Sequence, residues 1–168
     1  DILRGEPELE IVVRAEDVIV LRGTQAFVKS QAQASAYVPL TAQAATVLAA
    51  RLHVGSVVGA TVDTIPAARR FYAGGGGSVR GYAYQGVGPR FADNTPKGGT
   101  ALWDSSLELR QRVTGPWGVV AFVDAGSTGD GAVPDFGSVS AGAGLGLRFD
   151  PGFGPVRFDL AVPLSKRS

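Results

Sequence analysis

The sequence predicts an all-β protein: an antiparallel meander of about seven long strands, forming part of a transmembrane β-barrel with one long inward-folded loop. Three observations predict this class. Polar and apolar residues alternate with a period of two along most of the chain. The alternating segments are about 10 residues long, enough for a tilted strand to cross a bilayer and longer than the usual 5–6 residues. Short turns alternate with longer loops, and glycines recur on the polar faces.

Composition limits the alternatives. The 168 residues suffice for one domain with a sizeable core, and 45% of them are hydrophobic, which is too apolar for disorder. A net charge of +1 gives no broad basic face, so no nucleic-acid partner is expected. Cysteine is absent, which excludes disulfides and thiolate metal sites. No apolar run reaches the roughly 18 residues of a membrane-spanning helix. The chain begins with neither a signal peptide nor a methionine, which predicts a fragment or a processed form.

The N-terminal half predicts three strands in order. Alternation starts at Glu8, and Val and Ile are frequent in 17–22, but whether Glu16-Asp17 is a turn or a bulge stays open. Residues 1–22 therefore form either one strand or a hairpin. Phe27–Leu40 alternates more clearly, and Ala45–Gly59 follows. Alanine-rich Ala42–Ala50 has a helix as its rival interpretation, but its polar residues recur at two, which favours a strand.

Four more strands are predicted after residue 100: Ala101–Val113, Trp117–Gly126, Val139–Phe149 and Val156–Leu164. Asp104 and Glu108 share one face of the first, and Asp124 lies on the face of Val120 and Phe122 in the second. Trp103 and Trp117 are expected in the aromatic girdles that flank the lipid-facing band of a barrel.

The segment Arg70–Tyr82 is the candidate functional loop. It contains four consecutive glycines, Gly74, Gly75, Gly76 and Gly77, which disfavour regular structure. Aromatic and cationic residues flank them closely, so we expect a loop that folds back and docks, with Arg80 as its anchor at the tip. A mobile glycine-rich linker is the alternative. Docking requires an acidic partner elsewhere in the chain.

Enzyme chemistry finds little support, and no catalytic residue, metal site or cofactor is predicted. His53, the one histidine, falls on a polar strand face, which favours a structural, lumen-facing residue. The glycines of Gly142–Gly146 lack the spacing of a dinucleotide-binding loop, and Asp124–Thr128 lacks the acidic positions of a calcium loop.

Several motifs, in order, are similar to those of one family. The segments are Arg70–Gly75, Val79-Arg80-Gly81-Tyr82, Gly88-Pro89-Arg90, Glu108-Leu109-Arg110, Phe122–Gly126 and Gly154–Leu164. Together they resemble the Omp85 superfamily, also called the bacterial surface antigen (D15) family, with the closest likeness to its TamA branch. The likeness extends from about Phe27 to Leu164.

The resemblance implies a barrel of roughly sixteen strands whose sixth extracellular loop tucks into the lumen. It implies that Arg80 pairs with the wall residue Asp124 and that Glu108 contributes. Tyr82 is expected to pack the tip. Gly81 and the glycine quartet are expected to let the backbone pass close to the wall.

The same resemblance implies the biology. Residues 1–168 are expected to be a partial barrel that lacks the periplasmic POTRA domains, the N-terminal strands and the closing last strand. The implied role is non-enzymatic, the insertion or secretion of β-barrel or autotransporter proteins at the outer membrane of a Gram-negative bacterium. Expected partners are outer-membrane lipid, unfolded client proteins and a periplasm-spanning partner reached through the missing domains. A polypeptide-secretion pore of the two-partner type and a structural surface antigen without transport activity are the alternatives.

Overall fold

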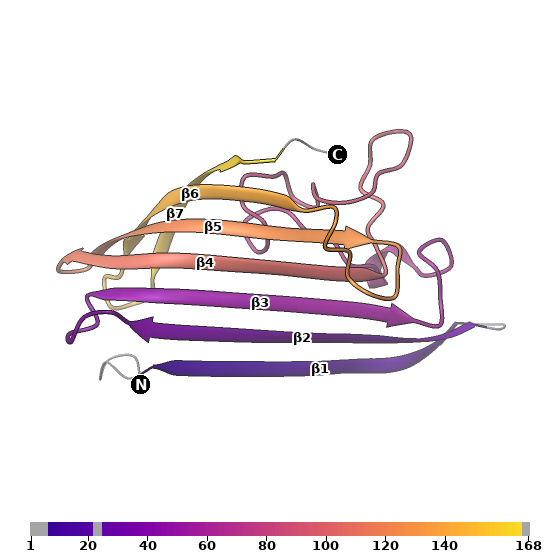
Figure 1. Cartoon of the computed structure of the whole chain (residues 1–168), viewed down its shortest axis with the longest axis horizontal. Helices are drawn as coiled ribbons and strands as arrows, with labels where there is room; N and C mark the ends of the chain where they lie inside the picture. Colours follow the sequence, from indigo (N-terminus) through magenta and orange to yellow (C-terminus); the bar gives the residue numbers. More distant parts are fainter. Residues whose placement is uncertain (1–6, 22–24, 166–168) are drawn as a thin grey trace.

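One antiparallel sheet accounts for every strand described. The structure, a computed structural model, describes residues 7–21 and 25–165. Its strands are β1 (Glu8–Leu21), β2 (Gln25–Pro39), β3 (Thr46–Val58), β4 (Ala101–Thr114), β5 (Trp117–Gly129), β6 (Ser140–Phe149) and β7 (Val156–Pro163). They pair in chain order, β1-β2-β3-β4-β5-β6-β7, and Figure 1 shows this meander. The predicted all-β class with its long-stranded meander is therefore confirmed.

Two ambiguities of the N-terminal half are resolved by the pairing. Glu16 is opposite Lys29 and Ile19 is opposite Phe27, so β1 has one residue more than β2 between these pairs. This is a β-bulge within one continuous strand, and a hairpin is excluded for the described part. Residues 46–50 belong to β3, so the alanine-rich segment that allowed a helix is extended over these positions.

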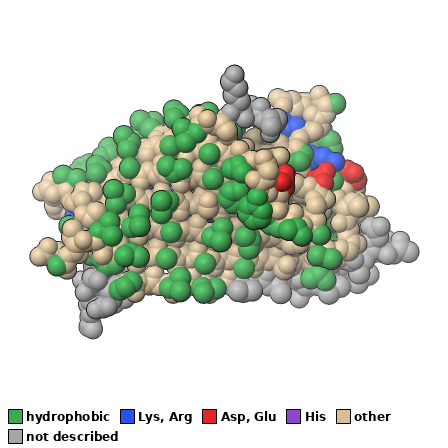
Figure 2. Space-filling model, in the orientation of Figure 1, with side chains coloured by type: hydrophobic (Ala, Val, Ile, Leu, Met, Phe, Trp, Pro, Cys, Tyr) green, Lys and Arg blue, Asp and Glu red, His purple; other side chains and the backbone are tan. Residues whose placement is uncertain are grey.

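The two faces of the sheet differ in chemistry. On the outer face, large apolar side chains stand exposed on every strand, with exposed fractions of 41–68% in the following examples: Leu9, Val38, Leu52, Leu107, Val123, Leu145 and Leu160. Figure 2 shows hydrophobic side chains scattered over the strands. An apolar surface of this extent marks contact with lipid or with another apolar surface. The alternate, inner positions of the described strands carry charged side chains, among them Arg51, Asp104, Glu108, Asp124 and Arg148.

The buried core lies between the inner face and the long loop of residues 59–100. The wall contributes Phe27, Val57 and Leu102, all at the same end of the sheet. The loop contributes Ile65, Phe71, Ala73, Val79, Tyr82 and Val87. Figure 1 shows the loop gathered at that end of the strands. Apart from a single 3-10 turn, η2 (Ala67–Arg69), the loop is irregular, and apolar contacts with the wall hold it.

The two ends of the sheet also differ. At one end the connections are residues 40–45, 115–116 and 150–155; at the other are the long loop and residues 130–139. Within the described residues, no helix has the length and apolar character required to span a membrane.

Candidate functional site: the lumenal arginine cluster

Arg80 extends from the long loop into the inner face of the sheet and meets Asp124 on β5. Its Nε lies 2.6 Å from Asp124 Oδ2, and its Nη2 lies 2.9 Å from Oδ1. The backbone N–H of Arg80 also donates to Oδ2, at 3.0 Å. Asp124 is completely buried and Arg80 is only 9% exposed. The guanidinium therefore binds the carboxylate in the two-pronged geometry that arginine favours, and the loop backbone adds a third bond.

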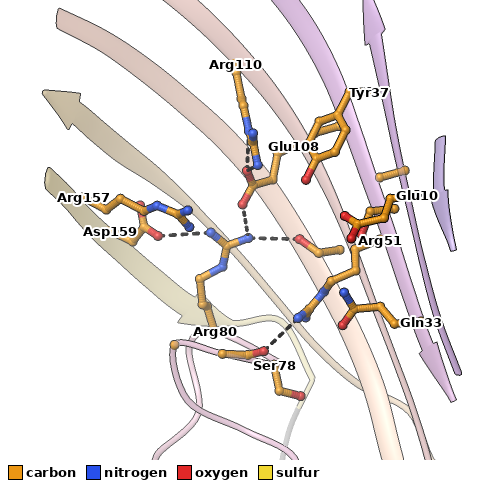
Figure 3. A pocket seen from close by; sticks show the side chains of 16 residues that line it. Glu10, Gln33, Tyr37, Arg51, Ser78, Arg80, Glu108, Arg110, Arg157 and Asp159 are labelled. Atoms are coloured by element: carbon orange, nitrogen blue, oxygen red, sulfur yellow. Dashed lines mark hydrogen bonds and ion pairs between the residues drawn. The ribbon is translucent and has the colours of Figure 1, made fainter. Parts of the chain in front are cut away.

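Arg80 contacts two further carboxylates on other strands. Its Nη2 lies 2.8 Å from Glu108 Oε1 on β4, and its Nη1 lies 3.1 Å from Asp159 Oδ2 on β7. Ser106 Oγ also accepts from Nη2, at 3.1 Å. Figure 3 shows Arg80 between Glu108 and Asp159 in an inner-face pocket of about 450 Å³. One side chain thus links three strands of the wall.

Asp159 was not among the predicted partners. Asp159 lies on β7. It reaches the cluster because β7 pairs antiparallel with β6, which places Asp159 opposite Gly146. The available signal was the alternation of Arg157 and Asp159 on the polar face of the last strand. That alternation shows on which face of the sheet Asp159 lies, but it does not determine the distance between Asp159 and Arg80.

The charges of the cluster balance. Glu108 is shared with Arg110, whose Nε lies 2.8 Å from Oε2, and Asp159 is shared with Arg148. Arg80, Arg110 and Arg148 therefore face Asp124, Glu108 and Asp159, three of each sign. Burial acts to lower the pKa of Arg80, but the hydrogen bond and negative charge of Asp124, helped by Glu108 and Asp159, raise it above its ordinary value. The Arg80 Cζ also lies 3.4 Å from the ring centre of Phe122.

Comparison with known proteins gives the family. A model of the Omp85 superfamily domain matches residues 11–168. This chain belongs to the Omp85 superfamily. The crystal structure of BamA from Haemophilus ducreyi lacking POTRA domains 1–3 is similar, with a TM-score of 0.70 and 24% sequence identity. The match covers 84% of this chain and 32% of that chain, so this chain spans about a third of its length. The predicted superfamily is confirmed, and the finer likeness to the TamA branch stays a prediction.

Membership of the Omp85 superfamily assigns the two faces of the sheet. The superfamily consists of outer-membrane β-barrels, so the exposed apolar face is the lipid side and the polar inner face lines the lumen. Closing such a wall into a barrel pairs all its backbone groups, which the membrane interior requires. The arginine cluster is then a lumenal cluster, and the loop of residues 59–100 occupies one end of the lumen.

The neighbours of Arg80 in the motif Val79-Arg80-Gly81-Tyr82 contact the wall in different ways. Val79 is fully buried, and a Cβ added to Gly126 on β5 would lie 2.9 Å from its Cγ2. Gly81 has a φ of +96°, and a Cβ there would lie 2.8 Å from the carbonyl of Val162 on β7. The hydroxyl of Tyr82 lies 2.8 Å from the carbonyl oxygen of Ser165, just past β7. Tyr82 therefore binds the end of the last described strand, a contact the sequence did not predict.

The glycine quartet plays a different part from the one expected. A Cβ on Gly74 would lie 2.7 Å from Ala83 O, within the loop itself, and the φ of Gly74 is +104°. A Cβ on Gly76 or Gly77 would meet nothing within 4 Å. Gly77 nevertheless contacts the wall through its backbone, because its carbonyl accepts a hydrogen bond from Arg51 on β3 at 2.9 Å. The first half of the quartet closes the loop on itself, whereas the approaches that leave no room for a Cβ against the wall are at Gly81 and at wall glycines such as Gly142.

Arg51 on β3 joins the long loop to an ion pair of the wall. Arg51 Nη1 donates to the carbonyl of Gly77 at 2.9 Å, while its Nη2 lies 2.7 Å from Asp104 Oδ1. His53 Nδ1 lies 3.0 Å from Asp104 Oδ2, and its Nε2 lies 3.4 Å from Gln31 Oε1. His53 thus contacts wall residues on the lumenal face. In the part of the chain that the structure describes, no group of three or more His, Cys, Asp or Glu side chains is arranged to hold a metal ion.

Proposed function

We propose that this chain is the C-terminal wall section of an outer-membrane barrel that inserts or translocates other proteins. Its role is non-enzymatic, and its surroundings are the lipid and the unfolded client proteins of a Gram-negative outer membrane. Residues 1–168 represent part of the wall of that barrel. One observation carries the proposal: the family's loop motif is bound inside the wall, with Arg80 contacting β4, β5 and β7 together.

In this proposal, the loop acts as an internal brace. Arg80 holds three strands in fixed register, and Tyr82 extends the contact to the end of β7. The apolar loop residues fill the lumen at the same end. A wall braced in this way stays rigid while a strand edge elsewhere in the complete barrel opens and pairs with an incoming client strand by β-augmentation. The likeness to the family supports the edge-pairing step, and the lumenal cluster supports the brace.

The test uses the full-length protein that contains this chain, reconstituted in liposomes of outer-membrane lipid. An unfolded β-barrel client is added, and its folding is followed by heat-modifiable electrophoretic mobility. We expect the wild-type protein to accelerate client folding and Arg80→Ala to lose most of that acceleration. Arg157→Ala is the matched control, since Arg157 lines the same pocket from β7, and it is expected to retain the acceleration.

Two other outcomes would decide between the alternatives. Unchanged client folding together with release of a co-expressed soluble partner into the medium would favour the secretion pore. Normal levels of outer-membrane proteins after depletion of the full-length protein, with neither activity in liposomes, would leave only a structural surface antigen.

A further inference from the structure

The connection between β5 and β6, residues 130–139, lies on the outer face of the sheet and is here called the flap. Ser56 Oγ on β3 donates to the carbonyl of Ala132 at 2.6 Å. Trp103 Nε1 on β4 donates to the carbonyl of Asp135 at 2.9 Å. Figure 1 shows the flap crossing in front of β4 toward β3, on the side of the sheet away from the long loop. The flap therefore contacts the lipid side of the wall, whereas the long loop contacts the lumenal side.

The flap covers Trp103, one of the two tryptophans expected in the aromatic girdles. Trp103 is only 9% exposed and its ring centre lies 5.1 Å from that of Phe136. Phe136 is itself 65% exposed, and Val133 is 72% exposed. The expectation that Trp103 faces the interface is therefore wrong, and apolar flap side chains occupy the outermost position above it. Trp117, at the opposite end of the wall, is exposed as expected.

Hydrogen bonds from the wall satisfy backbone carbonyls of the flap, which suits the flap to a surface that faces lipid. Backbone carbonyls at a lipid surface need partners, because hydrocarbon provides none. Three flap carbonyls have them: Ser56 binds Ala132, Trp103 binds Asp135, and Thr100 Oγ1 donates to Gly131 at 2.9 Å. The polar groups of Ser56 and Trp103, which face outward from the wall, are thereby directed to the flap instead of to lipid. The exposed remainder of the flap includes the apolar Val133 and Phe136.

Strand lengths place the flap at the level of the lipid headgroups. β3 and β5 have 13 residues each and β4 has 14, whereas about 9–11 tilted residues cross the hydrocarbon core. The flap binds Ser56 and Trp103, within the last three positions of β3 and the first three of β4, at the long-loop end. Its apolar side chains continue the exposed outer face, which includes Val28 and Val58 at the same end.

We propose that the flap is a membrane-interface anchor, with Val133 and Phe136 inserted among the lipids of the outer leaflet. The occupant of this surface is lipid, because the flap lies on the same face as the lipid-facing band and at its edge. This inference rests on the outer-membrane placement in the proposed function and goes beyond it. The flap gives the wall a lipid contact at its loop end, where Trp103 is covered.

Site-directed spin labelling tests this proposal in the full-length protein reconstituted in liposomes. This chain contains no cysteine, so Val133→Cys and Phe136→Cys are made in a background freed of any other cysteine. Leu147→Cys, on the outer face of β6, is the lipid control, and Ala92→Cys, exposed on the long loop, is the water control. Accessibility of each nitroxide to oxygen and to a water-soluble nickel complex is measured. Heat-modifiable mobility verifies that each variant has folded.

We expect labels at 133 and 136 to favour oxygen over the nickel complex several-fold more than the label at 92 does. An accessibility ratio equal to that at 92 would overturn the proposal while leaving the barrel in its membrane. Exclusion of both reagents, with spin-spin broadening, would also overturn it and would indicate a second copy as the occupant. A water-like result at 147 as well would instead overturn the membrane placement itself, so the two failures are distinguishable.

Discussion

At the scale of single residues, Arg80 has a role that lysine is poorly suited to fill. Its planar guanidinium has five N–H donors and uses them on Asp124, Glu108, Asp159 and a serine hydroxyl. A lysine ammonium has three donors on one atom and cannot span these partners. Because Asp124 is fully buried, removing its partner leaves a charge with little access to water. The cluster should therefore be sensitive even to conservative changes.

The first prediction concerns the stability of the barrel. Arg80→Ala should lower the free energy of unfolding by about 3–5 kcal/mol, the usual cost of breaking a buried pair, and Arg80→Lys should lower it by a smaller but measurable amount. Urea unfolding of the full-length barrel in liposomes, followed by heat-modifiable mobility, measures both. Equal stability of Arg80→Lys and wild type would contradict a site that depends on the guanidinium fork.

The second prediction concerns a charge swap. Arg80→Asp and Asp124→Arg should each impair assembly, and the double variant should recover only part of the loss. Recovery is limited because an aspartate at position 80 faces Glu108 and Asp159, which lie 2.8 and 3.1 Å from the arginine in the wild type. The yield of folded barrel in membranes measures this. Complete recovery would contradict the three-carboxylate site, and no recovery at all would contradict direct pairing of 80 with 124.

At the scale of elements, the inner face of β6 is shaped to receive the loop. Ser140, Gly142, Gly144, Gly146 and Arg148 alternate along it, and an added Cβ on Gly142 would collide with the carbonyl oxygen of Arg80. The loop backbone therefore occupies the space that a side chain on β6 would take. The glycines of the wall, more than those in the middle of the loop, determine how closely the two elements approach.

Two glycine variants, one in the wall and one in the middle of the loop, test this difference between the two sets of glycines. Gly142→Ala should displace the loop and cost about 1–3 kcal/mol, as overpacking does, whereas Gly76→Ala should change stability by less than about 0.5 kcal/mol. Gly76 has room for a methyl group, since a Cβ added there would meet no atom within 4 Å. Limited proteolysis of residues 59–100 in the folded barrel reports loop docking. Equal protection of the loop in both variants would show that the docking geometry does not depend on β6.

The strands were the most predictable elements, and the reason is physical. A period of two directly encodes which side chains face the lumen, so Asp104, Glu108 and Asp124 were assigned to polar faces from the sequence alone. The long-range partners of the loop were harder to predict. The period of a strand shows which face a side chain lies on, but it does not give the distance from that side chain to the loop. Asp159 and the Ser165 contact of Tyr82 depend on how far the loop reaches across β6. The flap was missed because the sequence of residues 130–139 does not indicate which face of the sheet this connection folds over.

At the scale of the whole molecule, two connections from the same end of the sheet contact opposite faces. The long loop fills the lumenal side, and the flap lies on the lipid side over β3 and β4. The wall between them is therefore held from both sides at the long-loop end. At the other end the connections are short, and the described residues contain no comparable inward loop there. This asymmetry predicts that the loop end is the less dynamic half of the lumen.

The coupling of the loop to the last described strand is the test of the brace as a whole. Tyr82 is separated from Ser165 by 83 positions, yet its hydroxyl lies 2.7 Å from Ser165 Oγ and 2.8 Å from the Ser165 carbonyl oxygen. Tyr82→Phe keeps the buried ring and removes these bonds, at a cost of about 1 kcal/mol. We expect amide hydrogen exchange at 160–165 to accelerate several-fold, with little change in β3.

Tyr72→Phe is the control for this variant, because the Tyr72 hydroxyl donates to Ala67 within the loop, at 3.1 Å. It removes a tyrosine hydroxyl bond from the same loop without touching β7. We therefore expect wild-type exchange at 160–165 in Tyr72→Phe. Equal exchange in both variants would mean that the loop fills the lumen without holding the end of β7. Faster exchange in Tyr82→Phe alone would mean that the loop controls the C-terminal side of the wall, where an Omp85 barrel continues toward its seam.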